Sequence, residues 1–142
     1  MFSKEDSKQI RQEFWTSFGN TYPHKWLLYN TKIKDVTLKF TFSTSRAQVS
    51  IDIEPKDNII RAYYYDKLIS LKNIITSEYL PSTIFNDSYE LENGKVISRI
   101  YVELTEVSIH NKKDWKQTMV FLHEKMSKLE AFFIEYKEYI ND

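Results

Sequence analysis

Residues 36–53 read VTLKFTFSTSRAQVSIDI, and in this stretch apolar and polar side chains alternate twice. Every second residue is apolar in Val36–Phe42 and again in Ala47–Ile53, with a polar break at Ser43–Arg46 between the two runs. A period of two is typical of a β-strand that buries one face. The stretch therefore predicts a β-hairpin with one apolar face, which the rest of the chain has to cover.

A second hairpin is predicted around Asn93-Gly94, because this dipeptide is the strongest short signal for a two-residue β-turn. The runs on either side of it, Ile84–Glu92 and Lys95–Leu104, are long enough to form strands. A two-residue turn would pair Glu92 with Lys95 and would place one set of side chains on a common apolar face. This predicted face consists of Phe85, Tyr89, Leu91, Val96, Ile100, Val102 and Leu104.

Two helices are predicted before the second hairpin, from apolar residues spaced three and four apart. The first begins at a capping box formed by Ser3 and Asp6 and ends at Gly19-Asn20. The second runs from about Asp57 to about Tyr79.

The last helix begins near Asn111 or Asp114, and its apolar residues repeat at alternating intervals of four and three. Such a 3.5-residue repeat is typical of a coiled coil, so a homodimer formed through this C-terminal helix is one interpretation. Phe121 and Phe132 widen the apolar stripe, which favours the other interpretation, a long helix that lies on the sheet of its own chain.

Together these elements predict a single α+β domain over residues 1–142. Its sheet, antiparallel or mixed, would have about five to six strands packed against three helices, in the order α-β-β-β-α-β-β-(β)-α. The additional strands in this order are short segments at Trp26–Tyr29 and Val107–Ile109.

Composition narrows the functional classes. The formal net charge is zero, and no segment has a long run of one sign, so the electrostatic signature of a protein that coats nucleic acid is missing. There is no cysteine, which excludes disulfides and thiolate metal sites. The first residues do not resemble a signal peptide and no apolar run reaches the length of a membrane span, so we expect a cytoplasmic bacterial protein without a membrane partner.

Most catalytic motifs are also missing from the sequence. Its two glycines, Gly19 and Gly94, are far apart, so no phosphate-binding loop can be assigned. The three histidines, His24, His110 and His123, show no spacing that is typical of a metal site or a catalytic set.

One set of residues fits a Mg²⁺-dependent nuclease of the PD-(D/E)xK type, whose core has the order α-β-β-β-α-β. If Phe42 faces Ala47 in the first hairpin, Asp35 lies opposite Glu54, close enough to share a cation, and Lys56 completes a Glu-x-Lys motif. Three points oppose this catalytic site. Pro55 interrupts the strand within the motif, the motif is short, and the polar outer face of the hairpin suggests a sheet that is wet on one side.

On the second hairpin, Arg99, Tyr101 and Glu103 point away from the predicted apolar face. They form a candidate binding site, since Arg and Tyr are favoured at recognition surfaces. The interpretation that we favour is a cross-strand arrangement of Arg and Glu on a solvent-facing sheet.

The most distinctive motifs of the chain lie in the second hairpin and at the start of the last helix. They are Gly94-Lys95, Ile97-Ser98-Arg99-Ile100-Tyr101, Glu103-Leu104, Val107-Ser108, Asn111 and Asp114-Trp115. With Phe14-Trp15, Phe18, Trp26, Tyr29, Ile51 and Ile53-Glu54, they resemble a bacterial family described as domain of unknown function 4268, over nearly the whole chain. The family has no established activity, so the resemblance implies no catalytic residues. It implies a domain that occurs alone or after a nuclease-like region, and so a companion role near nucleic acid.

The sequence therefore favours a non-enzymatic binding or accessory domain, whose partner is a protein or a nucleic acid. The alternatives are a Mg²⁺-dependent nuclease, active or degenerate, and a homodimeric interaction protein. No cofactor is expected apart from Mg²⁺ in the nuclease alternative.

Overall fold

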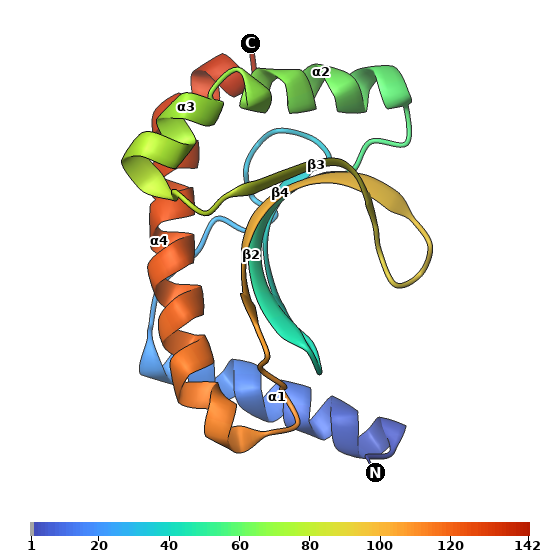
Figure 1. Ribbon diagram of the computed structural model, residues 1–142, viewed down its shortest axis with the longest axis vertical. Helices are drawn as coiled ribbons and strands as arrows, with labels where there is room; N and C mark the ends of the chain where they lie inside the picture. The colour runs from blue at the N-terminus through green and yellow to red at the C-terminus, as the bar shows by residue number, and fades with distance from the viewer. Residues whose placement is uncertain (1) are drawn as a thin grey trace.

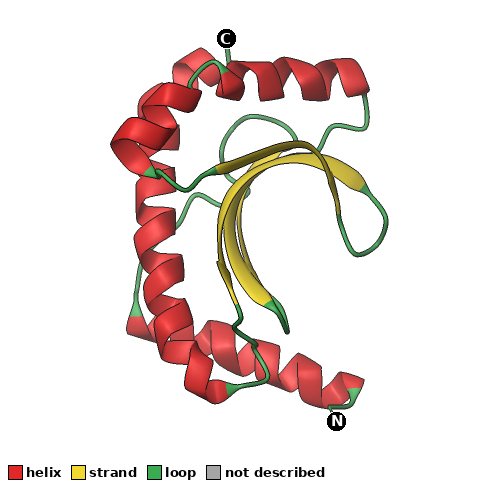
Figure 2. Ribbon diagram, in the orientation of Figure 1, coloured by secondary structure: helices red, strands yellow, loops and turns green. Residues whose placement is uncertain are grey.

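The computed structural model describes residues 2–142, which form one antiparallel four-stranded sheet with helices on one side and at both ends (Figures 1 and 2). The strand order is β1-β2-β4-β3, so β1 and β3 are the edge strands. The strands are β1 (Val36–Phe42), β2 (Arg46–Ile53), β3 (Ile84–Glu90) and β4 (Val96–Thr105). The helical segments are α1 (Lys4–Thr21), α2 (Asn58–Ile69), α3 (Lys72–Ile74), the π-helical η1 (Ile75–Tyr79), the 3₁₀-helical η2 (Lys112–Asp114) and α4 (Trp115–Ile140).

The first hairpin has the predicted register. Phe42 faces Ala47 and Val36 faces Ile53, so the apolar residues of both strands share one face. That face is the centre of the core, where Val49, Ile51 and Ile53 are fully buried. Strand β2 then pairs with β4 along its other edge, which extends the apolar face to Ile100 and Val102.

Helix α4 covers this apolar face, as Figure 2 shows. The apolar seam formed by its 3.5-residue repeat packs against other residues of the same chain. Leu122, Met126 and Phe133 are fully buried, and the indole of Trp115 donates to the Ile109 carbonyl at 2.8 Å. The residues of the 3.5-residue repeat therefore pack on the sheet of their own chain, in agreement with the favoured interpretation.

The second hairpin forms, but its predicted two-residue turn is wrong. The Gly94 amide donates to the Leu91 carbonyl at 2.9 Å and the Leu91 amide donates to the Lys95 carbonyl at 2.8 Å, so the loop has three residues. Gly94 has a φ of 86°, so it supplies the residue in the left-handed conformation that such a loop requires. Leu91 consequently pairs beside Lys95 rather than Val96, and the register shifts by one residue.

A β-bulge between Asn86 and Tyr89 adds a second change of register. Before the bulge Phe85 pairs with Ile100 on the core side, whereas after it Tyr89 pairs with Ile97 on the opposite side. The placement of Tyr89 on the apolar face was therefore wrong. The bulge is held by the Ser98 hydroxyl, which donates to the Asp87 carbonyl at 2.7 Å.

The predicted numbers of strands and helices differ from those observed, which are four of each. Trp26–Tyr29 is not a strand: the Leu27 amide donates to the Glu130 carboxylate of α4, and a single backbone hydrogen bond, from the Leu38 amide to the Leu28 carbonyl, links the segment to β1. Val107–Ile109 is not a strand either, because it makes a single backbone bond toward the first hairpin, from the Ile109 amide to the Ser43 carbonyl. The second predicted helix is divided into α2, α3 and η1, with a break at Ser70-Leu71.

The sheet is strongly curved, and this curvature sets the position of the candidate site. In Figure 1 the strands bend into a C, with α4 on the convex side, α2 near one end of the sheet and α1 near the other. The polar side chains of the strands lie on the concave side. Within residues 2–142 no helix is both long and apolar enough to span a membrane.

Candidate functional site: a polar groove on the concave side of the sheet

The concave side of the sheet is polar, yet its central side chains are buried. Gln48, Ser50 and Asp52 of β2 and Arg99 of β4 are each at most 3% exposed. We expected this face to be wet, because its residue types are those of a solvent-facing sheet. That expectation was wrong, since the curvature of the strands turns the face inward.

Arg99 is held by a two-pronged ion pair with Asp52, the residue opposite it on the neighbouring strand. Its Nε and Nη2 atoms each donate to one carboxylate oxygen of Asp52 at 2.8 Å. Burial alone would lower the pKa of Arg99, but the hydrogen bonds and the charge of Asp52 outweigh that effect, and the pKa is raised. The guanidinium also lies over the Tyr89 ring, 4.4 Å from its centre.

Gln48 links this ion pair to the rest of the concave face. Its Oε1 accepts from Nη1 of Arg99 at 2.7 Å, and its Nε2 donates to Glu103 at 3.0 Å and to the Tyr89 hydroxyl at 3.2 Å. Glu103 also pairs with Arg46 at 3.4 Å. The polar atoms of this floor are therefore largely occupied by one another, which makes the floor rigid and leaves it little capacity for a ligand.

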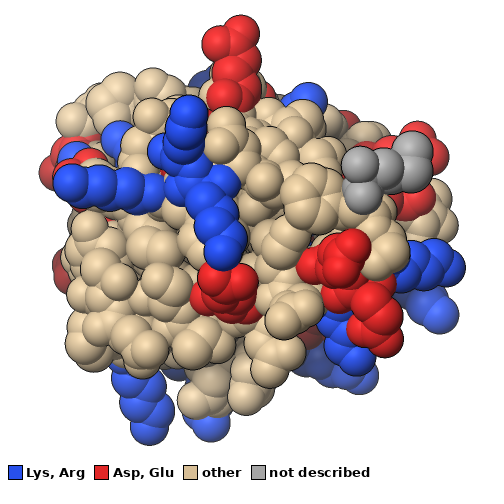
Figure 3. Space-filling model, turned by 90° about the horizontal axis from the view of Figure 1, so that it is seen from below, with Lys and Arg blue, Asp and Glu red and all other residues tan. Residues whose placement is uncertain are grey.

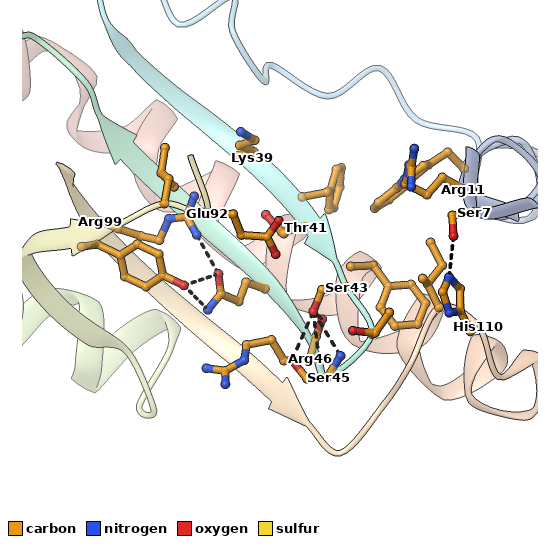
Figure 4. Close-up of a pocket in the computed structure, with 18 of the residues that line it drawn as sticks. Ser7, Arg11, Lys39, Thr41, Ser43, Ser45, Arg46, Glu92, Arg99 and His110 are labelled. Carbon is orange, nitrogen blue, oxygen red and sulfur yellow. Dashed lines mark hydrogen bonds between the residues drawn. The ribbon is translucent and has the colours of Figure 1, made fainter. Parts of the chain in front are cut away.

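This floor contributes Gln48, Tyr89 and Arg99 to the lining of a groove with a volume of about 680 Å³ (Figure 4). One wall is helix α1, which contributes Ser7, Arg11 and Trp15, and a second wall is strand β1 with the turn that follows it. The third wall is the end of the β3–β4 hairpin, residues 89–92. This volume is in the range of sites that hold small ligands or short segments of a larger partner.

The charges of the groove are divided between its walls. Arg11 and Lys39 stand on the α1 and β1 side, and neither has an ion-pair partner among residues 2–142. Glu92 stands on the hairpin side, whereas Glu90 pairs with Val96 and directs its side chain to the face opposite that of Tyr89. The surface that Figure 3 draws likewise mixes both signs with wide uncharged areas, so it shows no field of a single sign.

Within residues 2–142, two buried hydroxyl groups of the concave face have no hydrogen-bond partner. They are the Oγ1 of Thr41, which lines the groove, and the Oγ of Ser50, whose residue is fully buried in the next row of the face. A buried hydroxyl without a partner is costly, so such groups often mark a place where water or a ligand binds.

The residues of the nuclease alternative are only partly brought together. The Glu54 amide donates to the Asp35 carbonyl at 2.8 Å, so the two residues oppose each other as predicted. The Glu54 carboxylate, however, contacts Lys95 at 3.7 Å and the Thr37 hydroxyl at 3.4 Å, and Lys56 is exposed without an ion-pair partner. Among residues 2–142 no three His, Asp or Glu side chains cluster as they would around a metal ion.

The structure places Arg99, Tyr101 and Glu103 on the concave face, as expected, but with other partners. Arg99 pairs with Asp52 instead of Glu103, and Tyr101 is only 8% exposed. Burial, together with the charge of Glu103, raises the pKa of Tyr101. These three residues therefore belong mainly to the rigid floor and not to an exposed recognition surface.

Of the residues that line the groove, sequence reasoning named Arg99 as a candidate and missed the charged residues of the walls. Arg11 and Lys39 lie in separate elements, and no sequence pattern announces that α1 crosses the end of β1. The ion pair of Asp52 with Arg99 could have been found only from the pairing of β2 with β4, which is not encoded in the spacing of either hairpin.

Three comparisons with known proteins bear on this chain. Residues 10–137 match the model of a family described as "Domain of unknown function (DUF4268)". No curated protein and no solved structure matches the chain.

Proposed function

The chain belongs to the DUF4268 family, and from its geometry we propose that it is a non-enzymatic binding domain whose binding surface is the groove between α1, β1 and the β3–β4 hairpin. One observation carries the proposal: the groove combines a rigid floor of paired polar groups with three side chains, Arg11, Lys39 and Thr41, that have no hydrogen-bond or ion-pair partner within residues 2–142. Arg11, Lys39 and Thr41 have free hydrogen-bonding capacity, whereas Arg99 and Gln48 do not. A preorganised floor with free groups at its rim is what a binding site requires.

The chemistry of the groove supports binding more than catalysis. Its one nucleophile–base pair is Ser7 with His110, whose Oγ and Nε2 atoms are 3.2 Å apart. A catalytic pair needs a third group that orients the imidazole, and no acidic side chain in residues 2–142 contacts the other ring nitrogen. His110 instead packs on the ring of Phe2, with ring centres 4.1 Å apart.

The test is a binding measurement with defined probes. Purified protein is offered random peptides displayed on phage, and labelled single- and double-stranded DNA and RNA, with Mg²⁺, with Mn²⁺ or with EDTA. We expect one class of probe to be retained without cleavage, and its affinity to fall at least about tenfold in Arg11→Ala/Lys39→Ala.

The matched control is Lys34→Ala/Lys116→Ala, which removes the same charge from exposed sites outside the groove. If both double variants bind as the unaltered protein does, the groove is not the binding surface and the proposal is wrong.

A Mg²⁺-dependent nuclease that uses Asp35, Glu54 and Lys56 remains the second candidate, and the opposition of Asp35 and Glu54 across the hairpin supports it. The same assay tests it. Cleavage that needs Mg²⁺ or Mn²⁺ and disappears in Glu54→Gln would make this the better proposal.

A further inference from the structure

We propose that the groove binds a short extended peptide segment that carries an acidic side chain toward Arg11 and Lys39 and a basic side chain toward Glu92. This inference rests on the proposed function, because it assumes that the groove is the binding surface. It assigns the ligand class and the wall of the groove that each charged side chain of the ligand faces.

The shape of the groove suits an extended chain. Ser7, Arg11 and Trp15 are spaced four residues apart, so they form one stripe along α1. This stripe faces a continuous run of β1 and its turn, residues 39–46. One wall of the groove is therefore a continuous stretch of main chain, along which an extended segment can lie.

The open edge of β1 supplies main-chain partners for such a segment. Strand β1 is an edge strand, and the Ser43 amide bonds to the Arg46 carbonyl on the β2 side. Since successive residues of a strand direct their polar groups to opposite sides, those of Phe40 and Phe42 are directed to the open edge. Within the described chain no backbone group outside the sheet bonds to either residue, whereas the Leu38 amide is taken by Leu28.

Both of these residues also line the groove, although their side chains pack in the core. Their main chain is therefore the part that a ligand would meet. Adding a strand to an open sheet edge is a recurrent mode of peptide recognition, in which the backbone supplies affinity and the side chains supply specificity.

The divided charges supply the specificity. Lys39 and Arg11 lie on the β1 and α1 walls, and Glu92 projects from the hairpin that forms the opposite wall (Figure 4). A ligand of one sign, such as a nucleic-acid backbone, would be attracted by one wall and repelled by the other. A peptide with both signs satisfies both walls, and the lining also includes the Thr41 hydroxyl, which has no partner within residues 2–142, and the half-buried Trp15 ring.

The experiment reverses the charges of the groove. Random peptides on phage are selected on the unaltered protein and on a variant with Arg11→Glu, Lys39→Glu, Glu90→Lys and Glu92→Lys. All four residues are exposed, and Glu90 is included so that the net charge is unchanged, so folding and non-specific attraction stay constant. The control variant reverses Lys116, Lys128, Glu124 and Glu138, which are exposed on α4 outside the groove.

We expect the unaltered protein and the control to select peptides with the same order of acidic and basic residues, and the groove variant to select the reverse order. A peptide chosen by the unaltered protein should bind the groove variant at least about tenfold more weakly. A variant that carries only neutral replacements at these four positions should lose the preference for this order of charges but should not invert it.

Two results would overturn the inference, and they differ in what they say of the proposed function. If peptides or oligonucleotides bind and Arg11→Ala/Lys39→Ala weakens them, but charge reversal does not invert the selected order, the groove binds another class of ligand. If binding is unchanged in every groove variant, the proposed function fails together with this inference.

Discussion

Arg99 shows how a single residue can organise the polar side of this sheet. Its guanidinium is buried and loses its hydration, but it donates two hydrogen bonds to Asp52 and one to Gln48 and packs on the ring of Tyr89. An ion pair that is this deeply buried contributes less to stability than its short distances suggest, because both charges lose their hydration. Its contribution is to fix one arrangement of the floor of the groove.

We expect removal of one partner to cost more than removal of both. Arg99→Met leaves the Asp52 carboxylate buried and unpaired, which should lower the free energy of unfolding by about 3–5 kcal/mol. Arg99→Met combined with Asp52→Leu should recover a large part of that loss. Urea unfolding of the two single variants and the double variant measures the difference.

Arg46→Ala is the control for this comparison, because Arg46 makes a 3.4 Å pair with Glu103 at a half-exposed position. Its cost should stay below about 1 kcal/mol. A single Arg99 variant that unfolds like the Arg46 variant would show that the buried pair does not organise the floor.

Tyr101 should make the stability of the domain depend on pH in the alkaline range. Because burial and Glu103 raise its pKa above the ordinary 10.0, the folded state holds the phenol proton more tightly than the unfolded chain does. This contribution is fully present below about pH 10 and is lost as the pH rises through the raised pKa. Urea unfolding at neutral pH and above pH 10 should therefore show a smaller alkaline loss for Tyr101→Phe than for the unaltered protein.

Part of the alkaline loss should remain in that variant, since the pKa values of Tyr65 and Tyr79 are raised as well. Tyr29→Phe is the control, because the Tyr29 side chain is 84% exposed. Equal alkaline losses in Tyr101→Phe and Tyr29→Phe would contradict the assignment to Tyr101.

At the scale of elements, the two hairpins differ in how far their sequences determine them. In Val36–Ile53 the alternation and the turn agree, and the predicted register is confirmed. Around Asn93-Gly94 the same dipeptide is compatible with a two-residue and a three-residue loop, and these place the following residues on opposite faces. The bulge before Tyr89 depends on contacts with β4, so no local pattern could reveal it.

The two glycines of the chain should respond oppositely to replacement by alanine, because Gly94 lies in the three-residue loop and Gly19 lies in a helix. Gly94 has a φ of 86°, so Gly94→Ala should destabilise the domain by about 1–2 kcal/mol through backbone strain, although nothing lies near its Cβ position. Gly19 lies inside α1 with open space around it, and Gly19→Ala should stabilise the domain by about 0.5–1 kcal/mol. Thermal unfolding of both variants checks the signs, and a stabilising Gly94→Ala would rule out the left-handed loop.

At the scale of the whole molecule, the class of the fold followed from the sequence, but its curvature did not. Apolar spacing located α1, α4 and both hairpins, since each of these buries one periodic face. The groove exists because the sheet bends and α1 crosses the end of β1, and such long-range packing has no signature in the spacing of residues within one element. Alternation within β4 was enough to place the candidate residues Arg99, Tyr101 and Glu103 on the correct face. Arg11 was missed, because its place in the groove depends on how α1 packs.

The oligomeric state follows from the use of the α4 seam. Because Leu122, Met126 and Leu129 are at most 1% exposed within one chain, a coiled-coil dimer would have to uncover the core. We expect a monomer by multi-angle light scattering at micromolar concentration. A stable dimer that Ile134→Glu disrupts would instead identify the exposed side of α4 as an interface, since Ile134 is 58% exposed there.

Helix α4 follows all four strands along the chain, and this order has a consequence for synthesis on the ribosome. Strand β2 is made early, yet the helix that shields its apolar face begins only at Trp115. Until the residues of α4 leave the exit tunnel, Val49, Ile51 and Ile53 face solvent or a chaperone, so the core is completed only after Ile140 has emerged and not progressively. A nascent chain stalled before Trp115 should accordingly be cut by protease at rates typical of an unfolded chain, and one stalled well beyond Ile140 should resist.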